Sequence, residues 1–292
     1  MVMTKNIIRD IFYKYFPKRV VIDYIATRTI GRRINWRNPI DINDKINILK
    51  LTVNTKIWSD LADKYLVRKY VSDKGLSEIL IPLIAKYDNA EDIDFSKLPN
   101  AFVLKTNHGC GEVVIVKDKS RIDEKVIREQ MHKHLLYKYG LYQTEYHYLD
   151  IKPCIVAEQL ISETNSKYSS SIIDYKVWCF KGKAYCILCC FNRGENTNVA
   201  LYDTQWNYLH GKIRRTNHFT EKADYLPKPL NLDKMIEDAT ILSNEFPEVR
   251  VDLYNINGKI YFGEMTFTSL GGFMNYFTDD FLKDLGSQIE LK

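Results

Sequence analysis

The chain has 292 residues, of which 45% are hydrophobic and 27% charged, and these values are ordinary for a globular protein with a substantial core. No run of about eighteen apolar residues occurs, which excludes a membrane-spanning helix, and residues 1–10 lack the continuous apolar stretch of a secretory signal. The net charge of +5 is concentrated at the N-terminus, so the body of the chain does not show the positive excess of a nucleic-acid-binding protein.

The N-terminal segment is basic and amphipathic. Residues 1–40 contain nine Lys or Arg and two Asp, a balance of +7, which leaves −2 for the rest of the chain. The apolar residues that share one face of a predicted helix here are Ile7, Ile8, Ile11, Phe12, Tyr15 and Phe16. Such a helix either docks on the body of the protein and shows a solvated basic face, or lies on the anionic inner face of a membrane.

Helical and strand patterns follow one another along the rest of the chain. The predicted elements are helices at 44–51 and 58–70, an acidic loop at 88–99, strands at 101–105 and 113–117, a helix that Ser120 caps and that ends near Tyr139, a strand at 155–158, a hairpin at 175–191, a helix at 233–245 and a hairpin at 249–268. Because helices come first and antiparallel strands follow, this order predicts an α+β fold.

A loop with two glycines joins the strands at 101–105 and 113–117. Backbone N–H groups around Gly109 and Gly111 can surround phosphate oxygens. Lys105 ends a buried run at the start of the loop, where its ammonium either contacts phosphate or is solvated. A Gly-x-Gly loop is by itself a weak motif.

The strand at 155–158 ends in an acidic residue. Glu158 can accept a hydrogen bond from a ribose hydroxyl, and the backbone that follows it can bond an adenine ring. The alternative is a strand that simply ends in solvent.

The six cysteines lie mostly in apolar, strand-like runs. Cys186, Cys189 and Cys190 resemble half of a zinc site, but the sequence offers no second half, so we interpret them as buried thiols. Unpaired thiols predict a reducing compartment, the cytoplasm.

The last hairpin carries one carboxylate on each strand. Asp252 and Glu264 stand in otherwise apolar runs around Asn257-Gly258, which is a strong hairpin signal. A buried carboxylate is costly unless it is paired or binds a metal. A strict two-residue turn would pair Asp252 with Gly263 and turn it away from Glu264, whereas a three-residue loop with Gly258 in a bulge would put both carboxylates on one face. The bulged form predicts an all-oxygen site suited to Mg²⁺.

These motifs occur in the order and spacing of a known superfamily. The segments concerned are 41–46, 62–71, 105–109, 158–161, 174–176, 250–252 and 263–266. From about residue 38 to 272 the chain resembles the ATP-grasp superfamily, and most closely its TupA-like branch, named for teichuronopeptide biosynthesis. The resemblance implies two α+β lobes that clasp ATP, preceded by a mostly helical part: residues 1–100 helical, 101–161 the small lobe with the glycine loop, and 162–292 the large lobe with the carboxylates.

The resemblance also implies residue roles in nucleotide binding. Phosphate contacts would come from Lys64, Lys105 and the loop with Gly109 and Gly111. The hinge that reads adenine and ribose would comprise Glu158, Gln159, Leu160 and Ile161.

Further roles concern metal and catalysis. Asp252 and Glu264 would bridge Mg²⁺. Where the superfamily commonly has Asn, two residues after the second carboxylate, this chain has Thr266, a weaker ligand that would hold a second ion more loosely. Lys176 would approach the γ-phosphate or the acceptor. Arg250 would stabilise a tetrahedral intermediate, the alternative being a surface arginine at a strand start.

The implied activity is ATP-dependent ligation of a carboxylate to an amine through an acyl phosphate, in cell-surface or capsular polysaccharide biosynthesis, on an amino-acid or uronic-acid-type substrate. One alternative is a glycosyltransferase, although the chain offers only Asp279-Asp280 in place of an Asp-x-Asp turn after a Rossmann-like strand. Another is a non-catalytic ATP-grasp scaffold, against which the retained Lys105, Glu158 and paired carboxylates argue.

Overall fold

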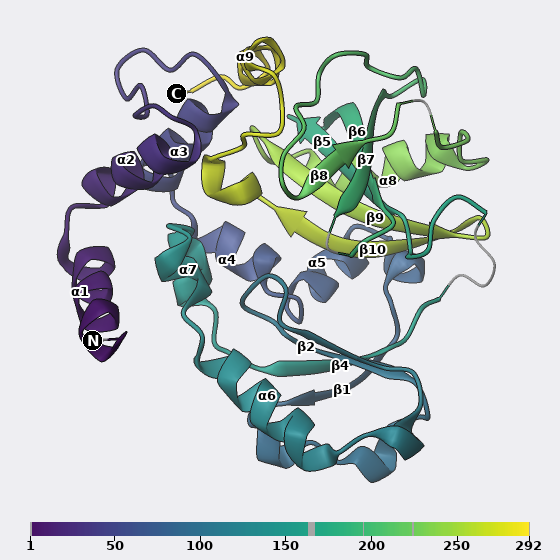
Figure 1. The fold of residues 1–292 in the computed structure, drawn as a ribbon. Helices are drawn as coiled ribbons and strands as arrows, with labels where there is room; N and C mark the ends of the chain where they lie inside the picture. Colours follow the sequence, from purple (N-terminus) through teal and green to yellow (C-terminus); the bar gives the residue numbers. More distant parts are fainter. Residues whose placement is uncertain (1, 163–166, 195, 224, 292) are drawn as a thin grey trace.

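A computed structural model describes residues 2–162, 167–194, 196–223 and 225–291, with side chains from residue 9 onward. The helices are α1 (Val2–Tyr15), α2 (Lys18–Thr29), α3 (Ile42–Thr52), α4 (Lys56–Ala62), α5 (Val67–Asp73), α6 (Glu124–Leu136), α7 (Tyr139–Tyr142), α8 (Leu232–Ser243) and α9 (Asp279–Ser287). The strands are β1 (Leu83–Tyr87), β2 (Phe102–Thr106), β3 (Val113–Val116), β4 (Ile155–Gln159), β5 (Asp174–Phe180), β6 (Lys183–Phe191), β7 (Thr197–Asp203), β8 (Phe219–Glu221), β9 (Val249–Ile256) and β10 (Lys259–Thr266). They form two sheets, with α4 and α5 between them (Figure 1).

The smaller sheet has the strand order β1-β4-β2-β3 and is antiparallel throughout. Burial alternates along β2, so Phe102 and Leu104 enter a core that also contains Met131 of α6. The expected small lobe, residues 101–161, leaves out β1. In the structure, however, β1 pairs with β4, and residues 90–98 belong to the same core. The sequence does not mark a strand at 83–87, because Leu-Ile-Ala-Lys-Tyr shows no apolar–polar alternation; in the structure these residues are mostly half-buried.

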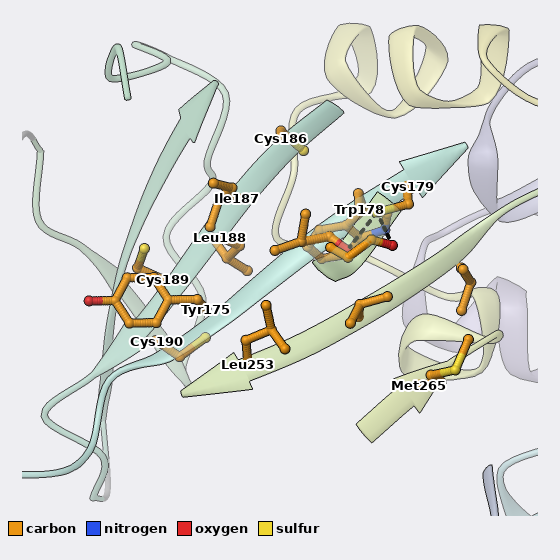
Figure 2. Packing of buried hydrophobic residues seen from close by; sticks show 14 of the residues in the cluster. Tyr175, Trp178, Cys179, Cys186, Ile187, Leu188, Cys189, Cys190, Leu253 and Met265 are labelled. Atoms are coloured by element: carbon orange, nitrogen blue, oxygen red, sulfur yellow. Dashed lines mark hydrogen bonds between the residues drawn. The ribbon is translucent and has the colours of Figure 1, made fainter. Parts of the chain in front are cut away.

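The larger sheet has the order β10-β9-β5-β6-β7-β8 and is antiparallel except for the pair β7–β8. Figure 2 shows part of its core, where Trp178, Leu253 and Met265 pack together with the cysteines of β5 and β6. The thiols of Cys186, Cys189 and Cys190 are free and buried in this core, which confirms their interpretation as buried thiols.

The helices α3, α4 and α5 pack on the larger sheet and belong to its core. Ile46, Leu61 and Val71 lie in the same apolar cluster as the strands of that sheet, and the ring of Trp58 stacks on Phe267 at 5.2 Å between centroids. These three helices are therefore not separate from the larger lobe.

Two predicted helices have different bounds in the structure. The helix predicted at 58–70 is broken into α4 and α5 at Asp63, whose carboxylate accepts hydrogen bonds from the backbone N–H groups of Tyr65 (2.8 Å) and Leu66 (3.2 Å). The helix assigned to a Ser120 cap begins later, because the side chain of Asp123 caps α6.

The first helix docks on α7 and also shows apolar side chains to solvent. The hydroxyl of Tyr142 donates to Asp10 at 2.8 Å, and the Tyr13 and Tyr142 rings lie 5.6 Å apart. Ile11, Tyr15 and Phe16 are exposed, and the side chains of Ile7 and Ile8 lie outside the described part. Within the described residues, no helix combines the length and apolarity needed to cross a bilayer.

Candidate active site

The hairpin β9–β10 brings two carboxylates side by side. Its turn is a two-residue one, because Ile256 pairs with Lys259 while Asn257 (φ 51°) and Gly258 (φ 82°) are both left-handed. The hairpin therefore has the two-residue turn and not the three-residue loop with Gly258 in a bulge.

The register instead shifts at a bulge further along β10. Phe262 pairs with Leu253, Gly263 is skipped, and Glu264 pairs with Asp252. The two carboxylates are direct cross-strand neighbours, so they lie on one face of the sheet. A Cβ atom on Gly263 would lie 2.9 Å from the backbone oxygen of Asp252, so only glycine fits this bulge without displacement.

Asp252 is buried and held by two cations. Arg250 donates to both carboxylate oxygens, from Nε to Oδ1 at 2.6 Å and from Nη2 to Oδ2 at 2.8 Å. Lys176 of β5, the cross-strand partner of Asp252, also donates to Oδ2. Burial by itself would raise the pKa of Asp252, but the two cations outweigh it and the pKa is lowered. Asp252 is therefore an anion at neutral pH.

Glu264 and Thr266 complete an oxygen-lined patch beside Asp252. The Thr266 hydroxyl donates to Glu264 Oε1 at 3.2 Å and accepts from Arg250 Nη2 at 3.1 Å. The side chain of Glu264 is 31% exposed, against 3% for Asp252. Two carboxylates and a hydroxyl are hard oxygen donors, so these residues fit Mg²⁺, which usually keeps waters and phosphate oxygens as its other ligands. Within the described residues, no group of three His, Cys, Asp or Glu side chains offers a closed metal cage.

Another buried carboxylate, that of Asp174, and a second arginine, Arg193, belong to this site, although the sequence assigned them no role. Lys176 Nζ lies 2.7 Å from Asp174 Oδ2, and Arg193, in the loop after β6, pairs with the same oxygen. Burial raises the pKa of Asp174 even though Lys176 opposes that shift. A carboxylate in a buried strand, the signal that identified Asp252, also marks Asp174. No local signal marks Arg193, because its partner lies 19 residues away.

In the smaller sheet, Glu158 is buried at the end of β4 and paired with two cations. Its Oε2 lies 2.6 Å from Lys105 Nζ, and its Oε1 lies 3.5 Å from a guanidinium nitrogen of Arg68. The interpretation of a strand that simply ends in solvent is therefore wrong for Glu158. Gln159 is exposed, and Leu160 and Ile161 follow the strand without regular structure.

The glycine loop is anchored to the turn between α4 and α5. Lys64 donates from its ammonium to the Gly109 oxygen and from its backbone N–H to Asn107. Lys64 thus lies in a turn and not on a helix surface. Gly111 has φ +91°, a left-handed value that favours glycine.

The tip of the glycine loop is within electrostatic range of the carboxylate site. Cys110 is exposed, and the surrounding protein raises the pKa of its thiol to about 11; the Glu264 carboxylate adds to that shift, while Lys64 and Lys176 oppose it.

Comparison with known proteins assigns this arrangement to a family. The model of the TupA-like ATP-grasp family matches residues 44–290. The chain belongs to the TupA-like ATP-grasp family. The family and the α+β ATP-grasp fold expected from the sequence are thereby confirmed. Among curated proteins, the search found no match.

Solved structures of ligases are similar to this chain at low sequence identity. The L-amino acid ligase from Bacillus licheniformis is 12% identical, with 89% of this chain and 57% of that chain covered and a TM-score of 0.50. The D-alanine–D-alanine ligase from Bacillus anthracis is 18% identical, with 78% and 63% covered and a TM-score of 0.44. This chain spans less than two thirds of either structure.

Proposed function

We propose that this TupA-like ATP-grasp protein is an ATP-dependent carboxylate–amine ligase. The observation that carries the proposal is the cross-strand pair Asp252 and Glu264, with the cations of Lys176 and Arg250 on the Asp252 carboxylate. Hard oxygen ligands beside two cations suit a divalent metal ion and the phosphate groups of a nucleotide.

ATP would bind in the gap between the two sheets. Its phosphates would meet Lys64, Lys105 and the backbone of Gly109 and Gly111, with adenine and ribose beside Glu158, Gln159, Leu160 and Ile161. Asp252, Glu264 and Thr266 would hold Mg²⁺, which neutralises charge on the transferring phosphoryl group when it is bound. Lys176 and Arg250, which pair with Asp252, would face the phosphates and the reacting carboxylate.

The reaction would proceed in two steps. A substrate carboxylate oxygen attacks the γ-phosphorus, and the bond to the bridging oxygen of ADP breaks, giving an acyl phosphate. An amine then attacks the acyl carbon, and inorganic phosphate leaves with the bonding electrons while the amine loses a proton. Positioning and electrostatic stabilisation account for most of the catalysis in such transfers, so no Ser or Cys nucleophile is required. Arg250 would stabilise the tetrahedral intermediate of the second step.

A binding and turnover experiment tests this function. We expect ATP with Mg²⁺ to bind in calorimetry and to raise the melting temperature, because ligand binds the native state alone. Asp252→Asn and Glu264→Gln should keep the fold and lose at least about a hundredfold in ADP release, as expected when electrostatic stabilisation is removed. Turnover of a sugar nucleotide without ATP would favour the glycosyltransferase alternative. ATP binding without ADP release on any substrate would favour the non-catalytic scaffold.

The substrates we propose are an amino acid and a uronic-acid-type sugar or polymer, in cell-surface polysaccharide or teichuronopeptide biosynthesis. The support is family membership. A screen of L-amino acids against uronic acids, following phosphate release, would identify the pair; release with amino acids alone would exclude the sugar.

We also propose that the N-terminal helices touch the inner face of a membrane. The N-terminal patch consists of the exposed side chains Ile11, Tyr15, Phe16, Val20 and Tyr24, interleaved with Lys14, Lys18, Arg19 and Arg28. Exposed apolar side chains among bases suit an anionic lipid surface.

A further inference from the structure

A cavity of about 640 Å³ lies between the helices α1 and α2, which stand at one side of the molecule (Figure 1). The described residues that line this α1–α2 cavity all come from these two helices, and no Asp or Glu is among them. Its walls include Arg9, Phe12, Tyr13, Tyr24, Ile25 and Arg28. The cavity therefore combines two permanent positive charges with aromatic and aliphatic surface.

Packed aromatic rings shape the cavity. The ring of Phe12 on α1 meets the ring of Tyr24 on α2 edge-on, with 5.1 Å between centroids. On the other side, Tyr13 contacts the ring of Tyr142 on α7 at 5.6 Å. Edge-to-face pairs at these distances are favourable, so the cavity is bounded by side chains that hold α1 against α2 and against the body of the protein.

The two guanidiniums of the cavity have weak partners. Arg28 Nη1 donates to the Tyr24 hydroxyl at 3.1 Å, and no ion pair joins Arg28 to a carboxylate in the described part of the chain. Arg9 lies over the ring of Tyr142 at 4.6 Å, and its Nε is 3.7 Å from Asp10 Oδ1, too far for a hydrogen bond. A guanidinium has several N–H donors, so both arginines keep donors for an anion.

The two acids of residues 1–40 do not compensate these charges closely, because both are bonded elsewhere. Asp10 Oδ1 accepts from the Tyr142 hydroxyl at 2.8 Å. Asp23 Oδ1 accepts from Trp36 Nε1 at 3.0 Å and from the backbone N–H of Ile34 at 3.2 Å. The positive charge that the sequence concentrates at the N-terminus therefore remains available at the cavity.

Arg9 and Arg28 act on the same point of the cavity. Burial raises the pKa of Tyr13, and Tyr24 adds to that shift, whereas the charges of Arg9 and Arg28 both oppose it. The two guanidiniums, although they come from different helices, are therefore both within electrostatic range of one phenolic hydroxyl.

This chemistry fits a phosphate group attached to a lipid. The fork of a guanidinium matches the geometry of phosphate oxygens, and a phenolic hydroxyl can donate to them as well. Tyr24 belongs both to the cavity and to the N-terminal patch, whose exposed apolar side chains include Ile11 and Phe16. A free inorganic anion gains nothing from such apolar surroundings, whereas a lipid has a charged headgroup and apolar chains side by side.

We propose that the α1–α2 cavity binds the phosphate group of an anionic lipid through Arg9, Arg28 and the Tyr13 hydroxyl, while the acyl chains stay in the bilayer against the N-terminal patch. The inference rests on the proposed membrane contact, because it names the lipid group which that contact would recognise. It replaces a general attraction between bases and an anionic surface with a defined site for one headgroup.

Calorimetry of the full-length protein tests the ligand. The probes are dihexanoyl phosphatidic acid below its critical micelle concentration, dihexanoylglycerol, which lacks the phosphate, and inorganic phosphate, which lacks the chains. We expect the lipid phosphate to bind at least about tenfold more tightly than either of the other two. Equal affinity for inorganic phosphate would overturn the lipid assignment, and no binding of the lipid phosphate would overturn the site.

Two arginines of α2 give a matched pair of variants. Arg28 lies over the ring of Tyr24 at 5.4 Å and Arg19 over the ring of Trp36 at 5.1 Å, and both are exposed, but only Arg28 lines the cavity. We expect Arg28→Met and Arg9→Met each to weaken binding of the lipid phosphate at least about tenfold, the effect of one charge-assisted hydrogen bond. Arg19→Met should weaken it by less than about twofold.

The same variants separate the cavity from general attraction to a membrane. AMPPNP–Mg²⁺ affinity should be unchanged in all of them, which shows that the fold is intact. If the wild-type protein co-sediments with phosphatidylglycerol vesicles, and Arg28→Met and Arg19→Met weaken that binding equally, the membrane contact stands and the cavity site is overturned. A wild-type protein that binds neither the vesicles nor the soluble lipid phosphate would overturn both.

Discussion

Among single residues, the buried Asp252 of the candidate site is paired with two cations, whereas one oxygen of a carboxylate just outside the site has no hydrogen-bond partner in the described part of the chain. Asp252 receives hydrogen bonds from Arg250 and Lys176. Glu248, immediately before β9, is 2% exposed, and its Oε1 has no hydrogen-bond partner among the described residues. Burial raises the pKa of Glu248 to about 8, although Arg250 opposes the shift. An ionised Glu248 therefore costs the native state free energy.

This carboxylate predicts a pH dependence of stability. The native state keeps a proton on Glu248 that the unfolded chain loses near its ordinary pKa, so the free energy of unfolding falls as pH rises from that value to about 8 and is level above it. We expect Glu248→Gln to match the wild type near pH 4 and to be more stable by roughly 3–5 kcal/mol at pH 8, since each pKa unit corresponds to about 1.4 kcal/mol. Urea unfolding at both pH values measures this.

The matched control for that experiment is Glu245→Gln. The side chain of Glu245 is 56% exposed and lies 2.6 Å from Lys74 Nζ, so its removal should leave the pH profile of the free energy of unfolding close to that of the wild type. Parallel profiles for wild type and Glu248→Gln would show that Glu248 is ionised or solvated in the native state.

At the scale of elements, the register of one hairpin decides whether a metal site exists. The turn at Asn257-Gly258 would by itself separate the two carboxylates, and the bulge at Gly263 brings them together. Turn chemistry acts locally and is readable from two residues, whereas a bulge depends on how β10 packs against β9. Because Gly263 packs closely against the backbone of Asp252, the alignment of the two carboxylates depends on this glycine.

Gly263→Ala should therefore weaken both the fold and metal-dependent nucleotide binding. We expect a loss of about 1–3 kcal/mol in the free energy of unfolding, typical of overpacking, and at least about tenfold weaker binding of AMPPNP–Mg²⁺ in calorimetry, because Glu264 and Asp252 lose their register. The control is Gly258→Ala, where φ is +82° and a Cβ would meet nothing within 4 Å. It should cost about 1 kcal/mol of stability without changing nucleotide affinity. Equal nucleotide affinities in the two variants would contradict the role of the bulge.

At the scale of the whole molecule, two apolar cores lie on either side of the candidate site. One surrounds the larger sheet and includes α3 to α5, and the other surrounds the smaller sheet. Each sheet therefore has its own apolar core, which makes it a packed unit by itself. The helices α1 and α2 flank this body, as Figure 1 shows in purple at one side of the chain.

The position of these helices gives a prediction for membrane binding. We expect the protein to bind phosphatidylglycerol vesicles in co-sedimentation at low salt and to be released as salt rises, because each basic residue near an anionic surface contributes about 1 kcal/mol and salt screens it. Tyr15→Glu with Phe16→Glu should weaken binding at least about tenfold and leave AMPPNP–Mg²⁺ affinity unchanged. Leu230→Glu, at a fully exposed leucine elsewhere, should change neither. If the wild-type protein does not co-sediment with such vesicles, the N-terminal patch has another role.

Features that depend on neighbouring residues can be read from the amino-acid sequence. Asn257-Gly258 predicts its hairpin, isolated carboxylates in apolar strands predict Asp252 and Glu264 as site residues, and the order of motifs predicts the family that was found. The turn and strand signals each involve only a few neighbouring residues, because turns and strands depend on local backbone preferences and side-chain alternation. The β1 strand, with little alternation, gave no such signal.

Contacts between groups that are far apart in the sequence follow from the packing of the whole chain. Lys64 reaches Gly109, which lies 45 residues away, and Asn47 reaches Gly272, which lies 225 residues away. The bulge at Gly263 depends on the backbone of the neighbouring strand. In the sequence of β10, only the glycine itself indicates such a bulge. Side-chain partners across such separations are set by the packing of sheets and helices, a property of the whole chain that no local pattern encodes.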